Sequence, residues 1–128
     1  MSVFKICLSM VLGTLTYWLG GYDMTLKTLL ALTIIDYITG ITTAFYKHRF
    51  KASICLKGII KKIYMYITVA LAVIVQKFTG DIIPLRETVL IFYIVTEGLS
   101  CVENIGKVIP YPEKLKEVFA QLGDNKNE

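Results

Sequence analysis

The feature that most constrains this chain is a series of long apolar runs, separated by short polar turns, that fills most of its 128 residues. A helix of about 20 apolar residues, rising about 1.5 Å per residue, crosses the roughly 30 Å hydrocarbon core of a bilayer. Hydrophobic residues make up 55% of the chain and charged residues only 19%. A chain this short cannot bury so much apolar surface in water, which argues against a soluble enzyme. The pattern predicts transmembrane helices at about residues 3–20, 26–46, 59–78 and 87–108.

The expected fold is therefore an all-α integral membrane bundle of four helices, forming a single domain over residues 1–128. The first run begins like a signal peptide, but no small-residue cleavage site follows it. Tyr17 and Trp18 mark its end as interfacial anchors do, so we expect a retained span. The alternative is three spans, with the first segment absent from the membrane or only peripheral.

A short amphipathic helix is expected after the last span. Pro110-Tyr111-Pro112 ends the apolar run, and apolar side chains then recur at i, i+3, i+4 and i+7. These side chains are Leu115, Val118, Phe119 and Leu122. Residues 112–128 are expected to form this helix and a polar tail.

Basic residues gather on one side of the predicted layout. The loop between the second and third spans carries six of them, and four more follow from Lys107 onward. Counting Lys5, this gives 11 against 3, which by the positive-inside rule places both termini and the basic loop in the cytoplasm. The loop residues are expected to lie at an anionic lipid surface rather than on nucleic acid. They are Lys47, Arg49, Lys51, Lys57, Lys61 and Lys62.

Polar and small residues form stripes along three of the predicted helices. Such faces require a partner helix or water, because lipid satisfies neither charge nor hydrogen bonds. One set is a candidate for pore lining or for polar contacts between helices: Asp36, Thr43, Glu97, Ser100 and Asn104. A second set is a candidate for close helix packing: Ser9, Gly13 and Gly40.

Asp36 lies near the middle of its predicted span. An unpaired charge at that depth costs from roughly 2.5 to over 10 kcal/mol, depending on how it is measured. The carboxylate must therefore be paired, neutralised or hydrated. Two interpretations stay open: a structural partner for a lysine or hydroxyl elsewhere in the bundle, or a pore-lining or proton-responsive group. Glu97 is a similar case.

The sequence points to no catalysis and no cofactor. It holds no nucleotide-binding loop, zinc-protease motif or nucleophile elbow. Cys7, Cys55 and Cys101 are far apart, no CxxC pair occurs, and His48 is the only histidine. We therefore expect no metal site, and the cysteines to act as small apolar side chains.

Four short motifs resemble those of the toxin secretion/phage lysis holin family. Asp36-Tyr37-Ile38-Thr39-Gly40 resembles its D-Y-x-T-G signature, and residues 57–62 (KGIIKK) resemble its K-G-[IL]-x-K-K entry to the next span. Residues 97–104 (EGLSCVEN) resemble the E-x-L-S-[IL]-[IL]-E-N block, with Cys101 where an aliphatic residue is commoner. Residues 110–115 (PYPEKL) resemble P-x-P-x-K-L. The likeness covers roughly residues 26–122, and residues 1–25 carry none of these motifs.

The resemblance implies a bacterial or prophage protein of the cytoplasmic membrane that accumulates as homo-oligomers. At a set time these form lesions that release a muralytic enzyme or, in some relatives, a large toxin. Two other classes also fit a small chain with acids in its spans. One is a small oligomeric proton-coupled transporter or channel, which makes no large hole. The other is a membrane adaptor that recruits a partner through its C-terminal helix.

Overall fold

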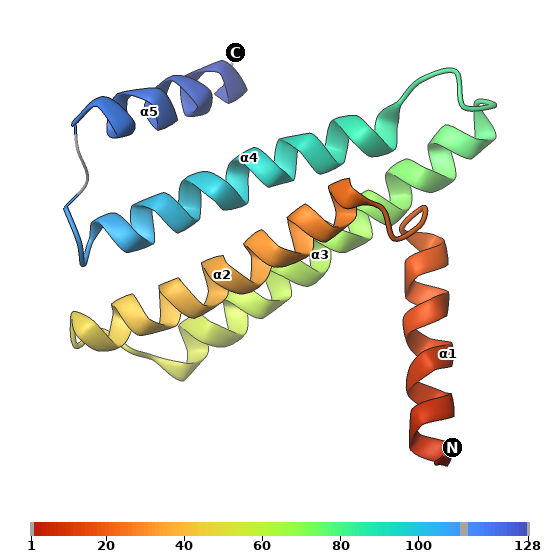
Figure 1. The fold of residues 1–128 in the computed structure, drawn as a ribbon, viewed down its shortest axis with the longest axis horizontal. Helices are drawn as coiled ribbons and strands as arrows, with labels where there is room; N and C mark the ends of the chain where they lie inside the picture. The colour runs from red at the N-terminus through yellow and green to blue at the C-terminus, as the bar shows by residue number, and fades with distance from the viewer. Residues whose placement is uncertain (1, 111–112, 128) are drawn as a thin grey trace.

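The computed structural model describes residues 2–110 and 113–127, and helices are the only regular secondary structure over these residues, as predicted. The helices are α1 (Val3–Trp18), α2 (Met24–Tyr46), α3 (Ala52–Phe78), α4 (Leu85–Gly106) and α5 (Glu113–Asn127). The second, third and fourth run side by side along the length of the molecule (Figure 1). Turns of only a few residues join them, so successive helices run in opposite directions.

The fourth helix is the centre of the bundle. It packs against both α2 and α3, whereas α2 and α3 make few contacts with each other. The short helix α5 folds back and contacts α4 (Figure 1). The space between α2 and α3 is therefore loosely packed in the half near the turn that joins them, whereas apolar side chains fill the other half.

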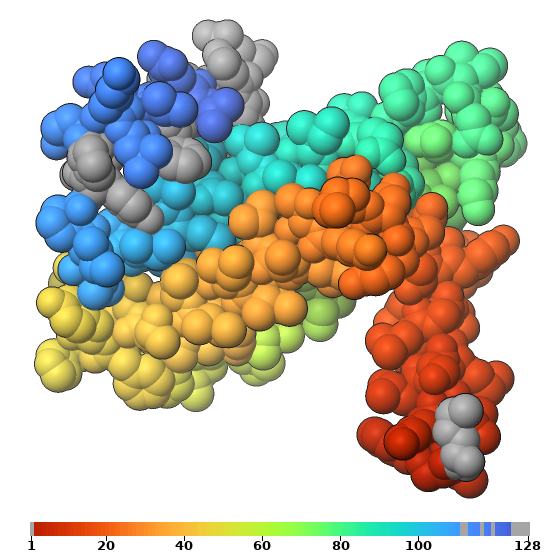
Figure 2. Space-filling view, in the orientation of Figure 1, coloured from red at the N-terminus to blue at the C-terminus, as the bar shows by residue number. Residues whose placement is uncertain are grey.

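Three of the helices, α2, α3 and α4, are long and apolar enough to cross a membrane. The 16 residues of α1 rise about 24 Å, which is less than the hydrocarbon thickness. This helix leaves the end of the bundle and runs across the direction of the other three (Figures 1 and 2). By length, α2, α3 and α4 fit the three-span alternative, and a fourth span formed by the shorter α1 stays a prediction.

The limits of two helices differ from the predicted ones. The third helix begins at Ala52, seven residues before the predicted 59, and its 27 residues rise about 40 Å. Its first two turns contain no proline and mix apolar side chains with lysine, so the helix extends beyond the hydrocarbon into the interface. The last helix continues past Leu122 to Asn127. Residues 112 and 128, and the Phe119 side chain of the predicted apolar stripe, lie outside the described part of the chain.

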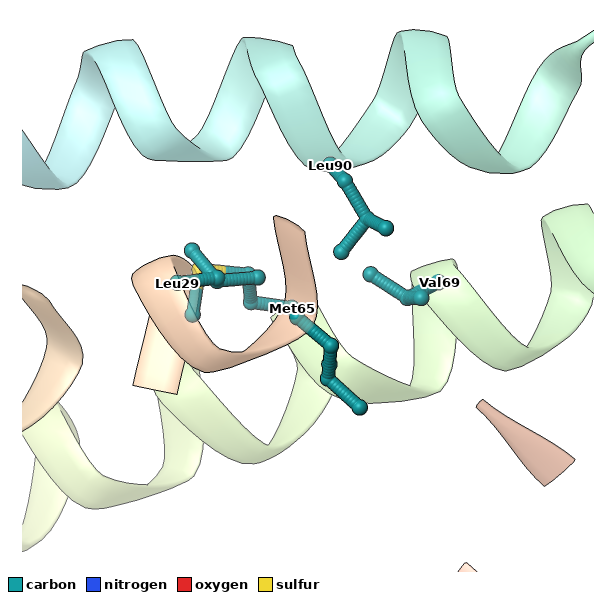
Figure 3. Close-up of a cluster of buried hydrophobic side chains, with 5 residues drawn as sticks. Leu29, Met65, Val69 and Leu90 are labelled. Atoms are coloured by element: carbon teal, nitrogen blue, oxygen red, sulfur yellow. The ribbon is translucent and has the colours of Figure 1, made fainter. Parts of the chain in front are cut away.

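A compact apolar cluster holds one half of the bundle together. Leu29 from α2, Met65 and Val69 from α3, and Leu90 from α4 meet between the three helices (Figure 3). All four are buried. Most other large apolar side chains of the spans face outward, which suits a lipid surrounding. The cluster seals the half of the bundle in which α2 begins and α3 ends.

Candidate functional site

The other half of the bundle contains a buried cluster of three charged side chains, one from each long helix. Lys62 Nζ on α3 donates to Asp36 Oδ2 on α2 at 2.6 Å and to Glu97 Oε2 on α4 at 2.8 Å. The three side chains are only 17%, 12% and 9% exposed, respectively. Asp36 and Glu97, predicted from the sequence as in-span acids, are thus brought together by one lysine.

The depth of the cluster explains why it must be paired. Ten residues separate Asp36 from the end of α2, which places the carboxylate about 15 Å below that end. This is close to the middle of a bilayer, where an isolated charge is costly. Two carboxylates and one ammonium sum to −1 when all are ionised, so pairing compensates the charge only in part. Removing one partner of a buried pair typically costs about 3–5 kcal/mol.

Asn104 ties the acid on α2 to α4. Its Nδ2 donates to Asp36 Oδ1 at 3.0 Å and to Thr39 Oγ1 at 3.2 Å, and Thr43 Oγ1 donates to the Asn104 carbonyl at 3.1 Å. Gly40 lies beside this contact: a Cβ there would lie 3.6 Å from Asn104 Nδ2, which is an ordinary van der Waals distance. Alanine would therefore fit at position 40, whereas a larger side chain would meet Asn104.

A cavity opens beside the cluster. It has a volume of about 480 Å³ and is lined by Asp36, Lys62, Glu97 and Ser100, together with residues of all three long helices. The gap between α2 and α3 forms its mouth. A second cavity of about 280 Å³ adjoins it at Gly40, Ala44, Arg49 and Asn104, which line both. The polar half of the bundle is therefore accessible from one side, whereas the apolar cluster closes the other half.

A second charged site lies at the opposite end of the bundle and was not predicted from the sequence. Arg86, at the start of α4, is buried. Its guanidinium donates to the Leu19 carbonyl at 2.6 Å, to the Gly21 carbonyl at 3.0 Å and to Asp23 Oδ2 at 2.7 Å. It also reaches Glu87 Oε1 at 2.7 Å. Five donors in a planar fork allow one arginine to hold the whole turn between α1 and α2.

Glycine is required in that turn. Gly20 has a φ of +86°, and a Cβ there would collide with the Arg86 side chain. Hydrogen bonding and the adjacent positive charge of Arg86 lower the pKa of Asp23 to about 2, and Asp23 Oδ1 also caps α2 through the Leu26 amide at 3.0 Å. Two sequence features together could have indicated this Arg86 site. One is the turn Gly20-Gly21-Tyr22-Asp23, and the other is an arginine at the start of a distant apolar run.

The structure distributes the remaining predicted residues over separate places. Ser9 and Gly13 lie on α1, where Ser9 is exposed and nothing lies within 4 Å of a Cβ built on Gly13. Within the single chain they do not pack helices, and their role between chains stays a prediction. Among the basic residues, Lys62 differs from expectation: its ammonium lies in the charge cluster and not at the lipid surface. The sequence could not assign it, because Lys61 and Lys62 are adjacent and only the rotation of α3 decides which one faces inward.

The described residues hold no group of three His, Cys, Asp or Glu side chains that could bind a metal ion. All three cysteines are free thiols. Buried Cys101 donates to the Leu32 carbonyl at 3.5 Å, across the interface between α4 and α2. The arrangement of the described residues offers charge and hydrogen bonding inside a membrane bundle.

The comparisons with known proteins agree with the motifs. Residues 13–124 match the family model of the bacteriophage holin family. An uncharacterized 14.9 kDa protein in the nagH 3' region of Clostridium perfringens is 35% identical over 118 residues, which cover 90% of this chain and 89% of that protein. Uncharacterized protein Lin0175 of Listeria innocua is 32% identical over 113 residues, 84% of this chain and 81% of the relative. Uncharacterized protein YqxH of Bacillus subtilis is 26% identical over 113 residues, 88% and 80% respectively. No solved structure matches.

Three of the motifs that carry the family resemblance supply the charge cluster. The D-Y-x-T-G motif contributes Asp36, Thr39 and Gly40, and the last lysine of the KGIIKK motif is Lys62. The EGLSCVEN motif contributes Glu97, Ser100 and Asn104. Residues from three separate segments thus meet at one site, where they share hydrogen bonds and line one cavity.

Proposed function

The chain belongs to the bacteriophage holin family, and on that premise we propose that it self-associates in the bacterial cytoplasmic membrane and opens lesions there. The released cargo is a cytosolic muralytic enzyme or a large toxin. The observation that carries the proposal is the charge cluster of Asp36, Lys62 and Glu97, buried among three helices whose outer faces are apolar. Such a chain can expose the apolar outer faces of its helices to lipid, or turn the polar side chains between its helices toward water.

In the resting chain, the polar side chains satisfy one another. Lys62 neutralises part of the charge of the two acids, and Asn104 and Thr43 bond across α2 and α4. The apolar cluster around Leu29 and Leu90 closes the other half of the bundle. One chain therefore provides no continuous polar path, and the membrane stays intact while single chains accumulate.

Lesion formation then requires the polar faces to turn from one another to water. Asp36 and Thr43 on α2, and Glu97, Ser100 and Asn104 on α4, would line the opening, and water would replace the Lys62 ion pairs. Several copies are needed, because three helices enclose too little space to pass a folded protein. The small residues of α1, Ser9 and Gly13, provide a surface on which chains can approach closely.

The membrane potential acts on this step only if charge moves through the field. Each elementary charge moved across the whole membrane contributes about 2.3 kcal/mol per 100 mV. Asp36 and Glu97 are the carriers we propose, since both lie deep in the bundle and share one lysine. Collapse of the potential would then favour the rearranged state.

We propose that the basic turn and the C-terminal segment face the cytoplasm, as their lysines and arginines predict. The exposed basic side chains then attract anionic lipid heads of the inner leaflet. With α2, α3 and α4 as the spans, the junction of α1 and α2 lies on the outer side, and α1 lies along the outer surface. This placement rests on the short length of α1 and on its direction across the bundle (Figure 1).

Controlled expression in a bacterium tests the proposal. The full chain is induced with and without a muralytic enzyme that has no export signal, and insertion is checked in membrane fractions. We expect abrupt growth arrest without the enzyme and rapid lysis with it. Membrane insertion followed by neither arrest nor lysis would contradict the proposal.

The size of what crosses the membrane separates this function from a proton-coupled transporter or channel. A lesion releases a folded cytosolic reporter protein into the medium, whereas a transporter dissipates or uses an ion gradient and retains the protein. Removal of residues 113–128 tests the adaptor class: lysis that persists in the truncated chain limits α5 to regulation.

A further inference from the structure

We propose that the groove between α2 and α3 is a binding site for one anionic phospholipid of the cytoplasmic leaflet. The proposal concerns a specific site and goes beyond the general attraction of basic residues to the membrane surface. It requires only that the three spans lie in a membrane with the basic turn at the cytoplasmic face. It does not depend on lesion formation.

The shape of the groove is the first observation. Because α2 and α3 both pack on α4 and hardly on each other, the space between them is open near the turn that joins them, with α4 as its floor. The two adjoining cavities there have volumes of about 480 and 280 Å³. Ligand sites in proteins commonly have roughly 300–1,000 Å³. The groove is thus large enough to take part of a lipid molecule.

The inner lining of the groove has an apolar part beside the charge cluster of Asp36, Lys62 and Glu97. Tyr37 and Ile41 contribute from α2, Ile54 and Met65 from α3, and Tyr93 from α4. Gly58 of α3 also lines it, and nothing lies within 4 Å of a Cβ built on this glycine. A hydrocarbon chain suits this apolar part of the lining, because water finds no hydrogen-bond partners there.

The mouth of the groove is strongly basic. Besides Lys62 of the charge cluster, five cationic side chains line the two cavities: Lys47, Arg49, Lys51, Lys61 and Lys107. None of them forms an ion pair with an acidic side chain in the part of the chain that the structure describes. Arg49 lines both cavities, at the point where they adjoin.

The position of these cations matches that of a lipid headgroup. Arg49 and Lys51 lie in the turn between α2 and α3, and Lys107 directly follows α4, so all three are at the cytoplasmic ends of the spans. Basic pockets between transmembrane helices on the cytoplasmic side bind anionic lipid heads. A phosphate at the mouth with an acyl chain along the apolar lining satisfies both parts of the groove.

Lipid retention by the purified full chain tests this site. The chain is titrated in detergent with phosphatidylglycerol or with phosphatidylcholine, and native mass spectrometry counts the bound lipids. We expect one phosphatidylglycerol to be retained at concentrations at which phosphatidylcholine is not. The combined variant R49Q/K51Q/K61Q should weaken this binding roughly 100-fold, from the usual attraction of each basic residue to an anionic membrane.

A matched variant controls for net charge. The combination K5Q/K27Q/K77Q removes the same number of charges from residues that do not line either cavity. It should retain phosphatidylglycerol as the unmodified chain does. An equal loss in both variants would show general electrostatic attraction and overturn the site.

Two further arms separate the possible occupants. Gly58→Phe fills the groove without changing charge, whereas Gly58→Ala leaves it open; loss of lipid only in Gly58→Phe supports an acyl chain in the groove. If Gly58→Phe has no effect and inorganic phosphate competes as well as the lipid does, the site holds a headgroup alone and the proposal fails.

A second copy of the chain is the other possible occupant. In a C7S/C101A chain, only Cys55 remains to form a thiol cross-link between copies. A cross-link that phosphatidylglycerol cannot suppress would assign the groove to a second copy and overturn the lipid site.

These results are independent of the lytic assay. A chain that lyses cells but retains no phosphatidylglycerol would remove the lipid site and leave the proposed function intact. A chain that retains the lipid through the groove but causes neither arrest nor lysis would contradict the proposed function and leave the lipid site intact. Circular dichroism of each variant checks that the helix content is unchanged.

Discussion

Lys62 is the residue on which the arrangement of the three long helices most depends. Its ammonium bridges Asp36 and Glu97, so it links α2 to α4 through α3. We expect Lys62→Met to lower the free energy of unfolding by about 3–5 kcal/mol, because it leaves two carboxylates buried without their cation. Thermal unfolding of the full chain in detergent, followed by circular dichroism, measures the loss.

The neighbouring lysine provides the control. Lys61→Met removes the same charge from an exposed position one residue away, and a surface change of this kind usually shifts stability by less than about 0.5 kcal/mol. Equal stability of the two variants would show that the cluster contributes nothing beyond general charge.

Asp23 gives the structure a stability limit at low pH. Arg86 lowers the pKa of this carboxyl to about 2, whereas the unfolded value is near 3.8. The stabilisation is therefore fully present above about pH 4 and is lost as the pH falls through about 2. Trp18, the single tryptophan, ends α1 next to the Leu19 carbonyl that Arg86 holds, so its fluorescence reports this transition.

The variant Asp23→Asn is the control for the acid titration. In Asp23→Asn the acid-dependent change in Trp18 emission should disappear, while the emission at neutral pH should already resemble that of the released turn. An unchanged acid transition in this variant would assign it to other carboxyls. Because Asp23 is nearly half exposed, solvent screening keeps the expected amplitude small.

The sequence shows which residues are polar within the spans, but not how far each helix is rotated. The stripe from Asp36 to Thr43, and the one from Glu97 to Asn104, follow from helical periodicity alone, and the structure brings them together on α2 and α4. Lys62 and Arg86 were not predicted as partners because their assignment needs the register of α3 and of the turn after α1. That register is set by packing between distant segments, such as Gly40 against Asn104.

At the scale of single elements, α1 is the helix whose position is most open to test. It has 16 residues, no buried side chain and few contacts with the bundle. We expect Cys7 to be modified by a membrane-impermeant maleimide added outside spheroplasts, in a C55A/C101A chain, because α1 would lie along the outer surface. Mass spectrometry of the labelled protein measures the modified fraction.

Protection of Cys7 from the external reagent, with labelling only after the membrane is opened, would place the N-terminus in the cytoplasm. That result would restore the four-span layout that the apolar run and the charge distribution predict. A cysteine placed in the C-terminal segment serves as the internal standard, since it should be protected until the membrane is opened. The sequence could not decide between the layouts, because hydropathy alone does not show where Gly20 and Gly21 let α1 turn away.

At the scale of the whole molecule, the bundle has two unlike halves. The half near the α1–α2 turn is closed by an apolar cluster (Figure 3). The half near the basic turn opens into a groove beside the charge cluster. This asymmetry is consistent with a chain that is stable alone in lipid and that has a polar interior to expose on assembly. The all-helical membrane class and the family were available from the sequence, whereas the asymmetry depends on how the three helices pack.

Release of cargo graded by size from vesicles tests this account most directly. The purified full chain is reconstituted at increasing density into vesicles loaded with a small dye and a folded fluorescent protein. We expect both cargoes to escape together above a threshold density. The threshold density should be lower in Lys62→Met, because the resting state is weakened. Escape of the dye or of ions alone at every density, with the folded protein retained, would contradict a lesion-forming function and favour a channel or transporter.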